Sequence, residues 1–382
     1  MMVHACEIIF WISIFIIIYS YLLYPVTLTI FSRAFGRPTL KNEQLRPIVA
    51  VLVPVHNEEN VIRKKIENIL NLDYPPEKLW IWIGSDCSTD ATEQIVRDLG
   101  HPRINLWRAP ERGGKTGVIN RLAPLIDADI ILFTDANTMH RRDCLRAMVR
   151  HFADPEVGGV AGHIDHVLSD EDEYAETFYR TFESKQKFME GLLHSTISAF
   201  GGFYALRSPL FRPIPANAYS NDDVLIPMNV VRQGFRVVYD AEAVSEEDVT
   251  EGVKTEFKRR IRIGAGNFQA FFWLLDFLNP LKGWPFFCYV SHKVTRWFSP
   301  LFFTMAALSC IFLFFASGRV LYSMIFMAGL VLSVAGVFHK FIPLRITRHI
   351  FYFIAMNTAL VLGFFRFIIG IRSAAWSRTE RV

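Results

Sequence analysis

The chain has 382 residues, of which 51% are hydrophobic and 20% charged, and its formal net charge is +4 at pH 7. This composition is too apolar for a disordered chain and too charged for one that lies entirely within a membrane, so we expect separate soluble and membrane parts. The modest charge, with no basic stripe interleaved with aromatic residues, argues against a nucleic-acid partner.

The first predicted element is an N-terminal membrane anchor. The stretch from Ile8 to Phe31 carries no Asp, Glu, Lys or Arg, and its roughly 24 residues would form a helix about 36 Å long, enough to cross a bilayer. No basic residue precedes it and no small-residue cleavage site follows it, which argues against a signal peptide. Residues 1–45 are therefore assigned to an anchor and a linker. Basic residues that follow the anchor predict an integral membrane protein of the inner or plasma membrane, with the next domain in the cytoplasm: Arg33, Arg37, Lys41 and Arg46.

Residues 46–264 predict one α/β domain. Short apolar runs at residues 48–53, 79–83, 104–107 and 130–133 alternate with stretches of helical periodicity. Unbroken apolar strands that are each followed by a helix predict a mostly parallel sheet covered on both faces. Asn57 is the expected N-cap of the first helix. Because ligands of such sheets bind at the carboxyl ends of the strands, the residues after each run are the candidates for a binding site.

All four predicted strands end in a polar signature. The signatures are Pro54-Val55-His56-Asn57-Glu58, Ser85-Asp86-Cys87-Ser88-Thr89-Asp90, Arg112-Gly113-Gly114-Lys115 and Thr134-Asp135-Ala136-Asn137. Each one alone could be only a cap or a turn, but four at one edge of a sheet indicate a binding site. Gly114-Lys115-Thr116 is not a phosphate-binding P-loop, because Ala109 stands where that motif requires glycine.

Three further motifs follow the strand-end signatures in chain order. They are Gly201-Gly202-Phe203-Tyr204-Ala205-Leu206-Arg207, Ser220-Asn221-Asp222-Asp223 and Lys258-Arg259-Arg260-Ile261-Arg262-Ile263. The ordered series, over residues 48–267, resembles the nucleotide-sugar-binding half of membrane-embedded family 2 glycosyltransferases, which include cellulose, chitin and hyaluronan synthases. The resemblance implies a cytoplasmic domain with the Rossmann-like GT-A fold. It also implies transfer of a sugar from a nucleotide diphosphate sugar, by default a UDP-sugar.

The resemblance implies that the strand-end residues bind this donor. Asp86 matches the acid that accepts the N3 proton of uracil, and Lys115 matches a phosphate-side lysine at the start of a helix, where the helix dipole adds to its charge. His56 stands where relatives contact the base, and Glu58 where they contact the ribose. Pro54 and Asn57 complete the first motif of the donor site.

The resemblance also implies a divalent cation and a catalytic base. Asp135 matches the first acid of the family's DxD metal motif, and Asn137 replaces the second, so we expect Mg²⁺ or Mn²⁺ bound by these two residues. Asp223 matches the general base that deprotonates the acceptor, and Asp222 would orient the site or bind the acceptor. One carboxylate acting as base predicts inversion, so that an α-linked donor gives a β-glycoside.

Acceptor binding is expected at a glycine pair and near the membrane. Gly201, Gly202 and Phe203 resemble the floor of the acceptor site. Arg259 and Arg262 align with the arginine-rich motif of processive synthases and would bind the diphosphate, although a basic membrane-facing helix is the alternative. Ile263 stands where that motif has tryptophan, which leaves long-chain processivity open.

The rest of the chain predicts membrane-associated structure. Residues 265–296 are rich in Phe and Trp but contain charges, which is typical of an interfacial amphipathic segment. Residues 297–382 contain about three apolar spans, at 297–318, 320–338 and 350–371. Four spans in total would leave three arginines outside, against the positive-inside tendency: Arg372, Arg378 and Arg381. A last segment that is re-entrant or interfacial is the alternative.

From these patterns we predict synthesis of a β-linked polysaccharide at the membrane. Transfer of a single sugar to a lipid-linked acceptor is the alternative within the family, so the expected partners are the bilayer and a saccharide or glycolipid acceptor. Four spans are few for a polymer channel, and a homo-oligomer or an export partner would then be needed. A non-catalytic component that only binds nucleotide sugars is disfavoured, because Asp135 and Asp223 are both present.

Overall fold

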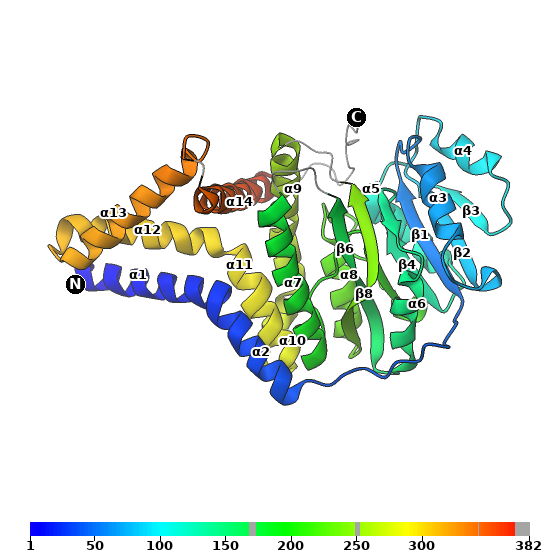
Figure 1. The fold of residues 1–382 in the computed structure, drawn as a ribbon, viewed down its shortest axis with the longest axis horizontal. Coiled ribbons are helices and arrows are strands. Elements are labelled where there is room, and N and C mark those ends of the chain that lie inside the picture. The colour runs from blue at the N-terminus through cyan, green and yellow to red at the C-terminus, as the bar shows by residue number, and fades with distance from the viewer. Residues whose placement is uncertain (168–172, 249–252, 343, 371–382) are drawn as a thin grey trace. The chain divides into compact units, whose positions relative to one another are not determined.

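The computed structural model describes residues 1–382 except 168–172, 249–252, 343 and 371–382 (Figure 1). The arginines of the predicted C-terminal tail therefore lie outside the described residues. The chain divides into two compact units. The α/β unit is built mainly of Leu28–Glu251, and the helical unit of Met1–Thr27, Gly252–Leu281 and Phe286–Gly370.

An eight-stranded sheet forms the centre of the α/β unit, in the order β3-β2-β1-β4-β7-β6-β8-β5. Its first half is parallel and contains the four predicted strands, β1 (Val49–Val55), β2 (Leu79–Ser85), β3 (Ile104–Arg108) and β4 (Ile130–Thr134). The second half is mixed: β7 (Phe203–Arg207) is antiparallel to β4 and to β6 (Val157–Val167), and β8 (Arg236–Asp248) is parallel to β6 and antiparallel to β5 (Thr138–His140).

The predicted parallel pairing is thus found throughout the first half of the sheet and again between β6 and β8, whereas the other three pairings are antiparallel. Parallel neighbours need a long crossover connection, usually a helix, whereas antiparallel neighbours do not. β5 follows β4 after a short turn, without the strand-then-helix pattern on which the prediction was based. β7 does follow β6 and a helix, α7 (Glu173–Leu193), yet it pairs in the antiparallel sense, so the pattern alone did not decide the pairing there.

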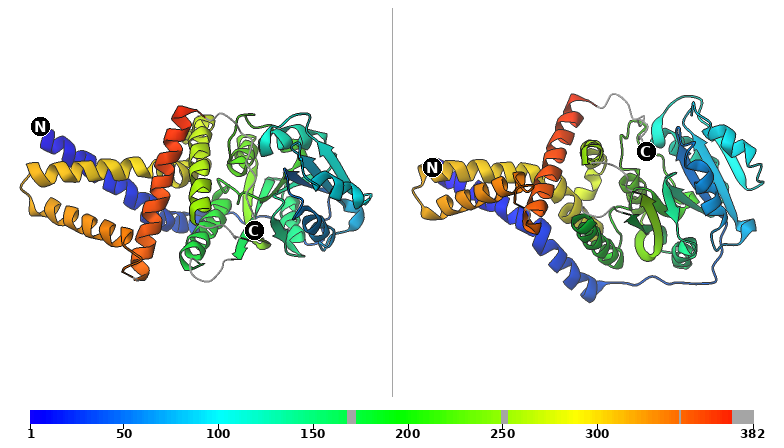
Figure 2. Two further views of the ribbon diagram at one scale, coloured as in Figure 1. Left: turned by 90° about the horizontal axis from the view of Figure 1, so that it is seen from above. Right: turned by 45° about the horizontal axis from the view of Figure 1, so that its top comes forward.

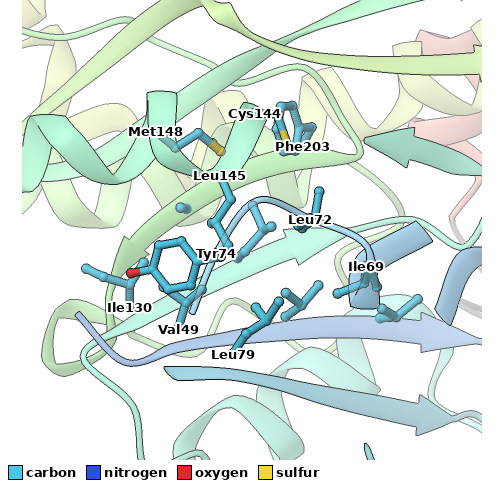
Figure 3. Close-up of a cluster of buried hydrophobic side chains, with 14 of the residues drawn as sticks. Val49, Ile69, Leu72, Tyr74, Leu79, Ile130, Cys144, Leu145, Met148 and Phe203 are labelled. Carbon is cyan, nitrogen blue, oxygen red and sulfur yellow. The ribbon is translucent and has the colours of Figure 1, made fainter. Parts of the chain in front are cut away.

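Helices cover the sheet and close its core. They are α3 (Ile62–Leu70), α4 (Thr92–Asp98), α5 (Gly114–Leu122), α6 (Cys144–Val149), α7 (Glu173–Leu193) and α8 (Asp222–Arg232). α3 places Ile62, Ile66 and Ile69 at helical spacing against one face of β1, and all three are fully buried. Figure 3 shows this cluster, in which Val49, Leu79 and Ile130 come from three neighbouring strands. Each fully buried isoleucine contributes roughly 1.5–3 kcal/mol to folding.

The predicted N-cap at Asn57 was wrong. α3 begins at Ile62, with Val61 in the capping position. Asn57 has a φ of 56°, in the left-handed region that Asn tolerates better than most residues. Its side-chain oxygen accepts a hydrogen bond from the backbone N–H of Thr89 at 2.8 Å, so it caps the loop after β2 rather than the helix. A residue type that suits a helix cap suits such a turn equally well.

Within the described residues, four helices are long and apolar enough to cross a membrane, by length and composition. The first is continuous through α1 (Met2–Ile18), η1 (Tyr19–Leu23) and α2 (Tyr24–Phe35), and the others lie within α12 (Ser299–Ala316), α13 (Val320–Val337) and α14 (Arg345–Ile369). α9 (Val253–Trp273) continues through residue 264, where the sequence predicts the α/β domain to end. The domain boundaries predicted from the sequence remain predictions. Short helices follow α9: η6 (Leu275–Leu278), η7 (Pro280–Lys282), α10 (Trp284–Cys288), η8 (Tyr289–Val294) and α11 (Thr295–Trp297).

Candidate active site

Asp86, directly after β2, is a fully buried carboxylate held by backbone amides. Its two oxygens accept hydrogen bonds from the N–H groups of Gly113 at 2.7 Å and Gly114 at 3.0 Å. The ring of His56 donates from Nδ1 to the backbone carbonyl of Asp86 at 2.9 Å. The ends of β1 and β2 and the loop before α5 therefore meet at Asp86. Because a carboxylate can accept about four hydrogen bonds, capacity remains for a ligand N–H.

The other residues of the first motif join the loops after β1 and β2. The N–H of Asn57 donates to Ser88 Oγ at 3.2 Å, and the N–H of Glu58 donates to Thr92 Oγ1 at 2.8 Å. Pro54 is buried within β1, where it pairs with Gly84 of β2. These bonds fix the surface on which the resemblance places a base and a ribose.

Lys115, in the first turn of α5, joins three motifs that are far apart in the sequence. Its Nζ lies 2.8 Å from Asp135 Oδ1 and 3.1 Å from Asp222 Oδ2, and it donates to the backbone carbonyl of Gly201 at 3.1 Å. Burial opposes the charge of Lys115, but the two carboxylates outweigh this effect and raise its pKa above the ordinary range. The lysine is therefore charged at neutral pH, between the predicted metal ligand and the predicted catalytic loop.

The two acids of the Ser220-Asn221-Asp222-Asp223 motif begin α8. Asn221, which precedes them, has a φ of 72°. The carboxylates of Asp222 and Asp223 lie in the first helical turn, where the helix dipole favours negative charge. Asp222 Oδ2 accepts a hydrogen bond from the hydroxyl of Tyr204 at 3.0 Å. Burial, together with Asp222 and Asp223, raises the pKa of Tyr204 well above its ordinary value, so its hydroxyl remains a donor.

Gly202 is required by the position of Asp135. A Cβ on Gly202 would lie 3.0 Å from Asp135 Oδ2 and 2.8 Å from Thr138 Oγ1, closer than side chains pack. Gly201 has room: a Cβ there would meet only Asp223 Oδ2, at 3.9 Å. The glycine pair thus lies between the predicted metal ligand and the predicted base.

Asp135 and Asn137 offer oxygen atoms of the kind that Mg²⁺ and Mn²⁺ prefer. The Asp135 side chain is 36% exposed, and Asn137 Nδ2 donates to Glu247 Oε1 at 2.8 Å, which leaves the amide oxygen of Asn137 as its metal-binding atom. Among the described residues, no group of three or more His, Cys, Asp or Glu could hold a metal ion. Mg²⁺ is commonly bound by one or two carboxylates together with substrate phosphates, and the pair fits a cation of that kind.

A buried lysine that the sequence analysis missed, Lys65, forms hydrogen bonds with residues on both sides of Asp135 and Asn137. Lys65 of α3 is fully buried, and its Nζ donates to Thr134 Oγ1 at 2.9 Å, to the carbonyl of Thr138, and to His140 Nε2 at 2.9 Å. These partners flank Asp135 and Asn137 on both sides. Burial lowers the pKa of Lys65 to about 7. The signal was available, because Lys65 falls on the same helical face as the three isoleucines of α3.

Phe203, one of the predicted acceptor residues, does not face the site. It is fully buried in β7, with its ring 4.8 Å from the ring of His140, so its side chain packs in the core. Arg259 and Arg262 belong to α9 of the helical unit, and their role in diphosphate binding stays a prediction.

Residues 50–210 match the model of a family described as Glycosyl transferase family 2. A curated relative from Nostoc sp., Beta-monoglucosyldiacylglycerol synthase, is 35% identical over 133 residues, which are 33% of this chain and 28% of that protein. The protein of the same name from Synechocystis sp. is 36% identical over 118 residues, or 30% of this chain and 25% of that protein. The chain therefore matches less than a third of the length of these relatives.

Two further comparisons extend over more of the chain. A Methanococcus voltae protein named dolichyl N-acetyl-alpha-D-glucosaminyl phosphate 3-beta-D-2,3-diacetamido-2,3-dideoxy-beta-D-glucuronosyltransferase is 23% identical over 57% of this chain and 72% of its own length. The mannosyltransferase PcManGT from Pyrobaculum calidifontis, solved in complex with GDP-Man and Mn²⁺, has a TM-score of 0.73 at 22% identity, covering 94% of this chain and 99% of that chain. At this identity the likeness establishes a common fold.

Proposed function

We propose that this chain transfers a sugar from a nucleotide diphosphate sugar to an acceptor at the membrane surface. Its residues 50–210 match family 2 glycosyltransferases, and its fold is the GT-A fold. The family and the fold are those that the ordered motifs predicted. The contact that carries the proposal is the bridge from Lys115 to Asp135, Asp222 and the carbonyl of Gly201. It gathers at one point the residues proposed for donor phosphates, cation and acceptor.

The donor would bind across the ends of β1, β2 and β4. Asp86 would accept an N–H of the base with its remaining lone pairs. A cation bound by Asp135 and Asn137 would supply positive charge that stabilises the leaving diphosphate. Because Asp135 would then be neutralised, Lys115 would be available to contact the phosphates as well.

Asp223 is the proposed base in this scheme. Asp222 accepts hydrogen bonds from Tyr204 and Lys115, which suits an orienting role, whereas the half-buried Asp223 lies beside Gly201. Asp223 would take the proton from the acceptor hydroxyl as that oxygen attacks the anomeric carbon. A direct displacement of this kind inverts the anomeric centre, so an α-linked donor gives a β-glycoside.

We propose a membrane lipid or a lipid-linked saccharide as acceptor. In the part of the chain that the structure describes, four helices are long and apolar enough to cross a membrane, and relatives at 35% and 36% identity over about a third of the chain are named for a glycolipid product. Extension of a polysaccharide is the second candidate, which the order of the motifs before the apolar helices favours. Ile263, in place of the tryptophan of the processive synthases, makes it the weaker one.

A donor panel tests this proposal. Purified protein in lipid vesicles containing diacylglycerol and polyprenyl phosphate would be incubated with Mg²⁺ or Mn²⁺ and radiolabelled UDP-glucose, UDP-N-acetylglucosamine or GDP-mannose. We expect label in the chloroform-soluble fraction with one donor, and its loss in Asp223→Asn. Label in ethanol-insoluble polymer would contradict the lipid acceptor and support extension of a polysaccharide instead. Release of free sugar alone from every donor would contradict glycosyl transfer.

A further inference from the structure

Asn137 places an amide where the DxD motif has its second acid. An amide oxygen can bind Mg²⁺ or Mn²⁺ but brings no charge, so Asp135 alone contributes a carboxylate from this loop. Asp135 also faces Lys115, whose positively charged Nζ lies 2.8 Å from Asp135 Oδ1. A divalent cation would therefore meet less negative charge here than two acids provide. A second carboxylate close to Asn137 would correct this deficit.

Glu247 of β8 brings such a carboxylate to Asn137. The amide nitrogen of Asn137 donates to Glu247 Oε1 at 2.8 Å, and both side chains are partly buried. Because an ionised carboxylate only accepts hydrogen bonds, the amide nitrogen must face Glu247 and the amide oxygen must point away from it. Hydrogen bonds to a charged acceptor are roughly twice as strong as neutral ones. Glu247 thus fixes the orientation in which Asn137 presents its oxygen to a cation.

The pairing of β5 with β8 explains why these two residues meet. β4 ends at Thr134 and β5 begins at Thr138, so the chain between them spans at most about 14 Å. In the sheet order, however, β7, β6 and β8 lie between β4 and β5. β6 and β8 pair with an irregularity between Ala161 and His163, and beyond it β8 reaches β5. In both views of Figure 2, the green strands of this half lie beside the blue strands of the first half. The end of β8 is therefore carried back to the loop after β4.

Glu247 belongs to a face of β8 that is held against β5. Thr138 of β5 lies opposite Glu247 in the antiparallel pair. His140 lies opposite Ser245, two residues along, so all four side chains share one face of the sheet. His140 Nε2 accepts a hydrogen bond from Lys65, so the neutral ring carries its proton on Nδ1 and donates it to Ser245 Oγ at 2.7 Å. Strand pairing and this bond together hold Glu247 beside Asn137.

The adjacent acid, Glu246, provides an internal comparison. Successive residues of a strand point to opposite faces, so Glu246 points away from the face that carries Glu247. Glu246 lies opposite Met139 of β5, and its Oε1 pairs with the guanidinium of Arg141 at 3.0 Å. Of the two neighbouring acids, Glu247 is therefore the one whose carboxylate serves the loop of Asp135 and Asn137.

We propose that Glu247 is a positioning residue of the cation site, which acts through Asn137 and supplies the negative charge that a second acid would bring. Its carboxylate orients and polarises the amide of Asn137, so that the amide oxygen becomes a better ligand. Loss of a partner that lies behind a metal ligand typically weakens metal binding about 10- to 100-fold. The inference rests on the proposed function, because it requires a divalent cation at Asp135 and Asn137 that takes part in donor binding.

Removal of the charge alone tests this role. In Glu247→Gln the new amide oxygen can still accept from Asn137, so the variant keeps the hydrogen bond and loses the negative charge. Purified protein would be dialysed to equilibrium with radiolabelled UDP or GDP over a range of Mn²⁺ concentrations. We expect the Mn²⁺ concentration that gives half-maximal nucleotide binding to rise about tenfold or more in Glu247→Gln, and to stay unchanged in the matched control Glu246→Gln. Equal values for the wild type and Glu247→Gln would overturn the proposal.

Relocation of the charge separates this role from a structural one. Asn137→Asp combined with Glu247→Gln moves the carboxylate to position 137, where the new amide at position 247 can donate to it. We expect the double variant to recover most of the Mn²⁺ dependence that Glu247→Gln loses. A double variant as impaired as Glu247→Gln would show that Glu247 only supports the local structure, and would overturn the proposal. Nucleotide binding by the wild type that does not depend on Mn²⁺ would contradict the cation of the proposed function as well.

Discussion

Substitution of Gly202, in the Gly201-Gly202 pair, tests whether close packing at this glycine positions Asp135 in the candidate active site. In Gly202→Ala the new Cβ would lie 3.0 Å from Asp135 Oδ2 and 2.8 Å from Thr138 Oγ1, where ordinary contacts begin at 3.4 Å. The two oxygens must therefore move by about 0.4 and 0.6 Å, the differences between those values. Overpacking of this kind costs about 1–3 kcal/mol of stability. Because a misplacement of about 1 Å can cost about a hundredfold in rate, we expect kcat/KM to fall roughly tenfold or more.

The neighbouring glycine supplies the control. In Gly201→Ala the new Cβ would meet only Asp223 Oδ2, at an ordinary 3.9 Å, so Asp135 need not move and the melting temperature should stay near that of the wild type. The measurement is thermal unfolding of both variants in vesicles, alongside release of nucleotide diphosphate by Gly202→Ala. Equal melting temperatures of the two variants would refute the inference that Gly202 is packed against Asp135.

Three further predictions concern the buried polar groups around the site. Lys115→Met should reduce kcat/KM about a hundredfold or more, because the donor phosphates and Asp135 both lose a positively charged partner. Lys115→Arg keeps the charge and should retain part of the activity. Steady-state kinetics measures both, and equal kcat/KM values for the two variants would show that the charge does not matter. Tyr204→Phe should lower the free energy of unfolding by about 1.5–3 kcal/mol through loss of a hydrogen bond to a charged group, as measured by denaturant titration in detergent, and an unchanged value would contradict the bond to Asp222. Burial lowers the pKa of Lys65 to about 7 in the folded protein, and Cys144 and Asp135 oppose this shift. The ring of His140, which burial keeps neutral, faces the Nζ of Lys65. The unfolded chain holds its proton up to about pH 10.4, so this lysine destabilises the fold most below pH 7 and progressively less as the pH rises. Lys65→Met should therefore flatten the rise of stability between pH 7 and 10, by at most about 1.4 kcal/mol per pH unit, and an unaltered slope would argue against the lowered pKa.

The parallel half of the sheet could be predicted because its strands are continuous apolar runs, each leading into a helix. The same rule failed beyond β4: β5 follows only a turn, and β7 pairs in the antiparallel sense although the helix α7 precedes it. Asn57 illustrates a second limit. Its side chain can cap a helix or a turn, and only the tertiary position of Thr89 decides between them.

The candidate site was predictable as a set of motifs but not as a set of contacts. The family resemblance places Lys115 at the start of a helix, yet its bonds to Asp222 and Gly201 depend on how β4 and β7 pair. Tyr204 was missed because its apolar neighbours in β7 make it look like a core residue, and its hydroxyl gains a function only beside α8. Lys65 could have been found, since a lysine in an apolar helical stripe must have buried partners.

The anomeric configuration of the product tests the central claim most directly. Purified protein would be supplied with the α-linked nucleotide sugar that it consumes, and the glycosidic linkage of the product would be determined from its anomeric proton coupling by NMR. A single displacement with Asp223 as base predicts a β-linkage. An α-linkage would require a different chemical route and would contradict the roles assigned to Asp223 and to the residues around it.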